Sequence, residues 1–177
     1  MDCPACQSRS LSPAKVTSGL PGFACNRCGG SLIELLAYRM WAEQQPASQT
    51  PRAEMSAAPP DTTKALVCPK CSKLMAKYRI DAQGENHIDL CGNCGRFWLD
   101  GGEWGLLESL NLQTGMTAIF NAPWQASIRK GDAQHLVEAR FQQELGAEAY
   151  QQARVFRDWL NKQPDKQRLL DYLARDD

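Results

Sequence analysis

The spacing of the cysteines constrains the fold of this chain more than any other feature of its sequence. The chain has 177 residues and eight cysteines, and every cysteine belongs to a C-x-x-C pair. The pairs are Cys3/Cys6, Cys25/Cys28, Cys68/Cys71 and Cys91/Cys94, with 18 residues between the first two pairs and 19 between the last two. Two pairs at such a distance are typical of a zinc site, because each pair lies on a tight turn and four thiolates then converge as a tetrahedron.

We therefore predict two structural zinc ions per chain. The ligands would be Cys3, Cys6, Cys25 and Cys28 for the first ion, and Cys68, Cys71, Cys91 and Cys94 for the second. A site closed by four thiolates leaves no position for water or substrate, so such a metal stabilises a fold and does not catalyse. Tetrahedral sulfur also suits iron, which stays open as the alternative metal.

The cysteine pattern is an internal duplication. The first pairs of the two halves are related by an offset of 65 residues and the second pairs by an offset of 66. A potential capping box follows each second pair, formed by Ser31 with Glu34 and by Asp100 with Glu103, and such boxes mark helix starts. Recurring apolar residues predict a helix over about 32–44 and another after Glu103. The duplicated unit is thus a zinc ribbon followed by a helix.

These patterns predict an α+β protein with four parts. The parts are a zinc ribbon plus helix (1–44), a Pro/Ala/Ser-rich linker (45–64), a second zinc ribbon plus helix (65–112) and a mostly α-helical C-terminal region (113–177). The linker contains four prolines and few large apolar side chains. We therefore expect a semi-extended spacer that leaves the two ribbons free to move relative to one another.

The second ribbon carries the clearest strand signal. Apolar and polar residues alternate from Lys73 to Asp81, which predicts a half-buried strand, and His87 to Leu90 would be the returning strand. Phe97 and Trp98 could stack on nucleic-acid bases, but we predict that they fill the ribbon core or pack against the following helix, because so small a domain otherwise lacks apolar mass. Structural zinc, worth ~10–16 kcal/mol of apparent binding energy, would dominate its stability.

The sequence predicts a series of helices in the C-terminal region, residues 113–177. Apolar residues recur at helical spacing from Ala133 to Leu145, Gly146 is a plausible stop, and a second stripe follows to Leu160. Pro164 would open a last segment. The large side chains Trp124, Phe141, Phe156 and Trp159 are available to this region. We expect them to form a core of their own, as in a small helical bundle.

Composition and charge count against a dedicated nucleic-acid binder and against a membrane or secreted protein. Hydrophobic residues make up 43% of the chain, and 20 Lys plus Arg balance 20 Asp plus Glu. A dedicated nucleic-acid binder usually shows a basic excess, so the balance counts against nucleic acid as the main partner. The start, M-D-C-P-A-C, lacks the pattern of a signal peptide, and no stretch approaches the ~18 apolar residues of a membrane span. We predict a cytoplasmic protein without membrane contact, in which paired cysteines are metal ligands rather than disulfides.

The remaining reactive residues could take part in redox chemistry, metal binding or catalysis, but the sequence favours simpler roles for them. Cys25 and Cys28 are the pair most open to thiol redox chemistry, since Arg27 between them could favour a thiolate. His87 and His135, the two histidines, are not needed as ligands beside four cysteines per site. No nucleophile, base and orienting group can be assembled from the sequence. We therefore predict no enzymatic activity and no small-molecule substrate.

A local basic group lies in the second ribbon, at Lys70, Lys73, Lys77 and Arg79. Such a strand face could contact phosphates. The simpler interpretation is a solvated strand side whose charges are balanced by Asp81, Glu85 and Asp89, and we favour it.

The stretch from Cys68 to Glu103 combines C-P-x-C with C-x-x-C-G-x-F-W-L-D-x-G-E. Over these 36 residues the chain resembles the transcription factor IIB-type zinc-ribbon (zinc-finger) family of small prokaryotic proteins. The resemblance implies a ribbon of short β-strands with Cys68, Cys71, Cys91 and Cys94 as zinc ligands, and it suggests a link to transcription. The family commonly has a second glycine where Arg96 stands here. The first copy keeps Gly29 and Gly30, but it has Leu32 at the position of Trp98.

We conclude from the sequence that the leading hypothesis is a zinc-binding, non-enzymatic adaptor or regulatory protein with tandem zinc ribbons. Its expected partner is another protein, in the transcription or translation machinery. The alternatives are direct nucleic-acid binding through the ribbon faces and, third, a thiol redox or chaperone-like protein.

Overall fold

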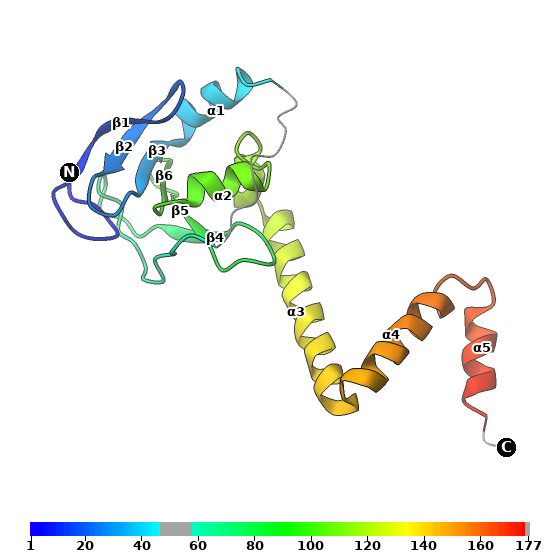
Figure 1. Cartoon of the computed structure of the whole chain (residues 1–177). Helices are drawn as coiled ribbons and strands as arrows, with labels where there is room; N and C mark the ends of the chain where they lie inside the picture. Colours follow the sequence, from blue (N-terminus) through cyan, green and yellow to red (C-terminus); the bar gives the residue numbers. More distant parts are fainter. Residues whose placement is uncertain (47–57, 176–177) are drawn as a thin grey trace. The chain divides into compact units, whose positions relative to one another are not determined.

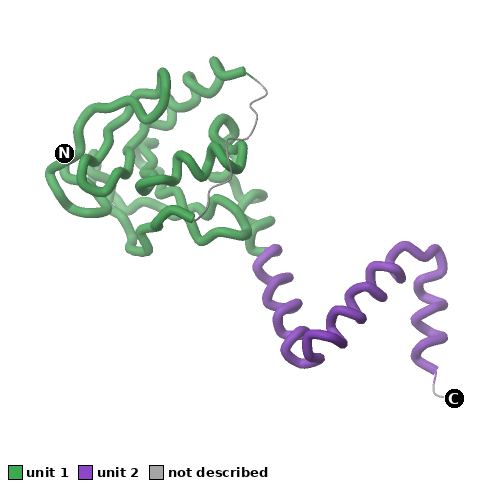
Figure 2. Tube along the Cα trace, viewed as in Figure 1, with its two compact units in different colours: residues 1–129 green, residues 130–177 purple. Residues whose placement is uncertain are grey.

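The computed structural model describes residues 1–46 and 58–175 of the chain. The chain divides into two compact units, Met1–Arg129 and Lys130–Asp177 (Figure 2). Most of the predicted linker, residues 47–57, lies outside the described residues. No helix in the described part of the chain is both long enough and apolar enough to cross a membrane.

The first unit is built on one antiparallel sheet of six strands (Figure 1). The strands are β1 (Leu11–Thr17), β2 (Leu20–Cys25), β3 (Ser31–Glu34), β4 (Ala76–Arg79), β5 (His87–Cys91) and β6 (Arg96–Leu99). Their order is β1-β2-β3-β6-β5-β4, so each copy of the duplication contributes three neighbouring strands. The predicted α+β class is confirmed. The expectation that the ribbons move independently is wrong, because backbone pairing continues from β3 into β6.

The junction of the two copies has a local two-fold symmetry. In the β3–β6 register, Ser31 lies opposite Leu99, Leu32 opposite Trp98, and Ile33 opposite Phe97. Leu32 and Trp98 occupy equivalent positions of the duplication, 66 residues apart. Each ribbon therefore pairs through the same edge, formed by its third strand. The approximate two-fold axis passes between these two residues, in the way that an isologous interface relates two subunits.

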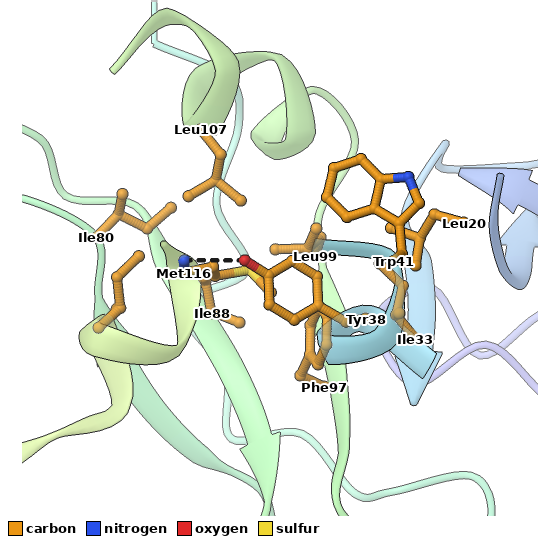
Figure 3. Packing of buried hydrophobic residues seen from close by; sticks show 11 residues of the cluster. Leu20, Ile33, Tyr38, Trp41, Ile80, Ile88, Phe97, Leu99, Leu107 and Met116 are labelled. Atoms are coloured by element: carbon orange, nitrogen blue, oxygen red, sulfur yellow. Dashed lines mark hydrogen bonds between the residues drawn. The ribbon is translucent and has the colours of Figure 1, made fainter. Parts of the chain in front are cut away.

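Helices cover one face of this sheet. They are α1 (Leu35–Glu43), α2 (Glu103–Ser109), the short 3-10 helix η1 (Met116–Phe120) and the first turns of α3 (Ala122–Leu145). The core between sheet and helices consists of Leu20, Ile33, Tyr38, Trp41, Ile80, Ile88, Phe97, Leu99, Leu107, Met116 and Ile119 (Figure 3). At its centre the Tyr38 hydroxyl accepts a hydrogen bond from the Met116 N–H at 3.0 Å and donates one to the Gln113 carbonyl at 2.9 Å. The buried hydroxyl is thus satisfied, and it fixes the loop before η1 on α1.

The start of the first helix differs from the prediction. Residues 31–34 form β3, α1 begins at Leu35, and no side chain caps its N-terminus, so the capping box of Ser31 and Glu34 does not form. Pairing with β6 buries Leu32 and Ile33 almost completely. That burial, together with the ladder hydrogen bonds, outweighs a local cap worth ~1 kcal/mol. The second box is half formed, since Glu103 accepts a hydrogen bond from the Asp100 N–H at 2.7 Å.

The outer edge of β4 is covered by a side chain. β4 is shorter than the predicted strand, and Leu74 makes only an isolated bridge with Val67. The Gln125 amide accepts a hydrogen bond from the Arg79 N–H at 3.3 Å and donates one to the Arg79 carbonyl at 2.9 Å. Gln125 thereby satisfies backbone groups that a further strand would otherwise pair with.

The second unit consists of the rest of α3, α4 (Ala147–Leu160) and α5 (Lys166–Leu173). Gly146, with φ +78°, separates α3 from α4 as predicted. The expected bundle core is absent: Leu160 is the one buried residue among residues 130–175, while Phe141, Phe156 and Trp159 are 50%, 42% and 47% exposed. The contact between α3 and α4 is instead polar, because Glu138 accepts hydrogen bonds from Tyr150 and Arg157.

Gly30→Ala tests the close approach at the junction of the ribbons. A Cβ on Gly30 would overlap the indole ring of Trp98 and lie 2.9 Å from the Leu99 carbonyl oxygen. We expect a loss of about 1–3 kcal/mol in the free energy of unfolding, the usual cost of overpacking, measured by chemical denaturation. The control is Gly92→Ala, where a Cβ meets nothing within 4 Å. Equal stability of the two variants would contradict the described junction.

Candidate metal centres

The first cysteine group forms where the N-terminal loop meets the turn after β2. The Cys3 and Cys28 sulfurs lie 3.6 Å apart, as do those of Cys6 and Cys25. All four sulfurs lie within 4.8 Å of one another. Backbone hydrogen bonds shape the two turns, with the Gln7 N–H bonded to the Cys3 carbonyl and the Gly29 N–H to the Cys25 carbonyl, both at 2.9 Å.

The second group repeats this geometry. The sulfurs of Cys68 and Cys94 lie 3.5 Å apart, and those of Cys71 and Cys91 lie 3.4 Å apart. A tetrahedral zinc with Zn–S bonds of 2.3 Å would hold its sulfurs about 3.8 Å apart, whereas a disulfide needs about 2.05 Å. All eight cysteines are free thiols, so each group could hold a metal ion with a small outward adjustment.

Each turn needs one residue with a left-handed backbone. In the second pairs these residues are Gly29 (φ +74°) and Gly95 (φ +64°), which explains the C-x-x-C-G pattern in the sequence. In the first pairs they are Gln7 (φ 57°) and Ser72 (φ 56°), at equivalent positions of the duplication. The four turns thus share one conformation, and it directs both sulfurs of a pair to the same point.

Burial and hydrogen bonding divide the thiols into two kinds. Burial raises the pKa of Cys68 to about 12, and it raises the pKa of Cys3 well above its usual range. Burial also opposes ionisation of Cys25, but hydrogen bonds from Ser10 and from backbone N–H groups outweigh it and lower the pKa of Cys25 to about 5. The Lys73 N–H contributes most to lowering the pKa of Cys71 to about 6. Each group therefore offers a ready thiolate beside protonated thiols, whose protons a metal ion would displace.

Two hydroxyl groups distinguish the first site from the second. The Ser8 hydroxyl lies 3.0 Å from the Cys6 sulfur, and the Ser10 hydroxyl lies 2.8 Å from the Cys25 sulfur. The equivalent positions in the second copy are Lys73 and Met75, which carry no hydroxyl. Groups that hydrogen-bond a metal ligand tune its affinity and reactivity, so the two sites should differ chemically despite their equal geometry.

Both cysteine groups belong to one apolar layer on the face of the sheet opposite to the helical core. The layer contains Cys3, Leu11, Cys25, Leu32, Leu66, Cys68, Met75, Cys91 and Trp98. Trp98 is fully buried, and its indole N–H donates to the Asp100 carboxylate at 2.7 Å. The prediction that Phe97 and Trp98 are core residues is confirmed. They face opposite sides of the sheet, since Phe97 belongs to the helical core.

A third group of possible ligands, Asp61, Asp100 and Glu103, lies nearby. Asp61 accepts a hydrogen bond from the His87 N–H at 2.9 Å, and Glu103 accepts one from the Asn86 amide at 3.2 Å. Burial raises the pKa of Glu103 to about 8. Every one of these carboxylates already accepts hydrogen bonds from the chain, so the group serves as a structural anchor.

This anchor holds the end of the predicted linker on the second ribbon. The Thr62 N–H donates to Asp100, and the Asn86 amide donates to the Pro59 carbonyl at 3.0 Å. Asp61 and Asn86 carry no signal in the sequence, because their contacts join segments with no characteristic spacing. Only the relation of Asp100 to Glu103 was visible, as a capping box.

Two members of the basic group of the second ribbon form ion pairs within the chain, while Lys70 and Lys73 are exposed. Lys77 forms an ion pair with Asp89 at 3.0 Å, and Arg79 forms one with Glu85 at 3.2 Å. Despite the Lys77 charge, burial raises the pKa of Asp89 to about 6. The predicted charge balance is thus confirmed for Lys77 and Arg79, but the predicted solvated strand side is wrong, because these two side chains are only 21% and 17% exposed. His87 begins β5 and contacts Asp61, and the exposed His135 lies on α3.

Comparison of the chain with protein-family models, with curated proteins and with solved structures gave no match. The zinc-ribbon-like character of the two sites therefore rests on their own geometry. In each, four thiols converge from two turns beside short antiparallel strands.

Ser10→Ala tests the hydroxyl contact of the first site. The thiolate of Cys25 is present above its lowered pKa of about 5 and is lost as pH falls through that value. Without the hydroxyl the pKa rises, so protons displace the metal at a higher pH. We expect a pH titration of zinc release to move upward for one of the two ions. The second site is the internal control, and an unshifted titration would contradict a role of the hydroxyl.

Trp98→Ala tests the shared apolar layer. Deleting so large a buried side chain should lower the free energy of unfolding by about 3–5 kcal/mol. Because the indole belongs to the same apolar layer as both cysteine groups, we also expect a competing chelator to remove both metal ions faster. Leu36→Ala, at an exposed position of α1 in the same unit, is the control. Faster release from one site alone would show that the layer does not couple the two.

Proposed function

We propose that this chain is a zinc-binding, non-enzymatic adaptor or regulatory protein in which two zinc ions hold one duplicated ribbon domain together. The observation that carries the proposal is the presence of two groups of four thiols, each converging on one point. Sulfur ligands in a tetrahedron suit Zn²⁺, and a site closed by four thiolates has a structural role.

The position of the sites supports this structural role. Both groups lie in the apolar layer that covers one face of the sheet. Apparent binding energies of structural zinc, ~10–16 kcal/mol, are comparable to the whole stability of a small domain. Zinc would therefore fix this face of the sheet, whereas the helical core stabilises the other.

The adaptor role is supported by the second unit. Residues 130–175 expose many large apolar side chains along their helices, and extended apolar surface on a protein commonly marks a contact with another protein. We propose the transcription machinery as the setting, on the resemblance of Cys68 to Glu103 to transcription factor IIB-type ribbons. The ion pairs of Lys77 and Arg79 give no support to direct nucleic-acid binding.

The metal content per chain tests the structural proposal. Elemental analysis should find two zinc ions per chain, and a thiol reagent should detect the cysteines only after a chelator removes the metal. Removal should also change the fluorescence of the buried Trp98. If iron is found in place of zinc, the identity of the proposed metal is wrong but its structural role stands. Zinc-free protein with disulfides would contradict the proposal and favour the thiol redox alternative.

A further inference from the structure

The helix α4 has two unlike faces. On one face Tyr150 and Arg157 donate hydrogen bonds to Glu138 of α3, the latter at 2.6 Å. The opposite face carries Gln152, Val155, Phe156 and Trp159, at the i, i+3, i+4 and i+7 spacing of one helical surface. We call these four residues the α4 stripe. The contact with α3 thus leaves the α4 stripe pointing away from the hydrogen bonds that hold α4 in place.

The α4 stripe is uncovered within its unit. Val155 is 61% exposed, and the rings of Phe156 and Trp159, with centroids 5.4 Å apart, are 42% and 47% exposed. A helix of 14 residues is marginal in water unless its apolar face is packed against something. Its stability therefore calls for a partner surface.

The apolar surface of the second unit is large enough for a stable interface. The side chains that contribute are Leu136, Val137, Phe141, Leu145, Val155, Phe156, Trp159, Leu170, Tyr172 and Leu173. Exposed by about half each, they leave on the order of 1,000 Å² uncovered. A standard protein–protein interface buries about 800 Å² per partner. The three apolar residues of the α4 stripe supply only part of this area, so a partner seated on the stripe would also have to cover apolar side chains of α3 or α5.

We propose that the partner is a second copy of this chain, whose α4 stripe packs antiparallel against the first. The α4 stripe is symmetric about the midpoint between Val155 and Phe156, so two copies set Val155 against Phe156 and Gln152 against Trp159. The same register brings Glu148, at the start of α4, close to Lys162 at the end of the other copy's helix. Such self-complementarity is what a two-fold interface requires.

The nearly balanced charge of residues 130–175 favours a second copy of this chain over a strongly charged partner. Residues 130–175 contain eight Lys or Arg and seven Asp or Glu, so a nucleic acid or a highly acidic protein would gain little attraction. The inference rests on that part of the proposed function in which residues 130–175 contact protein, and it is independent of the metal.

Sedimentation of the full chain over a range of concentrations tests the inference. We expect a monomer–dimer equilibrium, and Trp159→Glu should weaken the dimer by roughly 30-fold or more, as for loss of a central aromatic anchor. The matched control is Arg154→Gln, which makes the same change in charge on an exposed position of α4 outside the stripe. A wild-type chain that stays monomeric at all concentrations, or equal weakening by both variants, would overturn the proposal.

A charge swap tests that the partner is a second copy in the antiparallel register. Glu148→Lys would place two lysines together at each end of the interface and should weaken the dimer about three- to tenfold. Adding Lys162→Glu to the same chain should restore it. No restoration would overturn the antiparallel register. A monomeric chain that still captures a host protein, lost with Trp159→Glu, would overturn self-association while leaving the adaptor function standing.

Discussion

The backbone pairing of β3 with β6 is the interaction on which the rest of the structure depends. Each ribbon has three short strands, and a domain of about 40 residues rarely buries enough apolar surface to be stable alone. Joined edge to edge, the two copies form a six-stranded sheet with two usable faces. One face carries both cysteine groups and the other packs against the helices. The apolar core and the proposed metal ions therefore stabilise the same sheet from opposite sides.

The two-fold junction also explains why the two copies have diverged. Residues at equivalent positions approach one another at the axis, and there is space for one large side chain only. Trp98 occupies that space, so its counterpart is the smaller Leu32, and Gly30 leaves room for the indole ring where the second copy has Arg96. The hydroxyls of Ser8 and Ser10 beside the first group, without counterparts beside the second, are a further divergence. The two ribbons thus carry cysteine groups of similar geometry and unequal surroundings, each of which could hold a metal ion.

The two units of the chain differ in how far they cover their apolar side chains. The first has a well-formed core, in which Trp98, Phe97 and Tyr38 are completely buried. The second keeps α3 and α4 together through Glu138, Tyr150 and Arg157 and leaves its apolar side chains uncovered. Uncovered apolar surface is costly in water, which is why we propose that another chain covers it.

Local patterns in the sequence determined the two cysteine groups, the duplicated unit, the helix break at Gly146 and the α+β class, because each depends on residues close together or on a repeated spacing. Tertiary structure decided the rest. Residues 31–34 form a strand although they carry a helix-start pattern, since their pairing partners lie 62 to 68 residues further along the chain. The anchoring of Thr62 by Asp100 and the absence of a core in residues 130–175 likewise depend on which segments meet in space. The sequence shows which side chains are apolar, but only long-range packing determines which segments bury them.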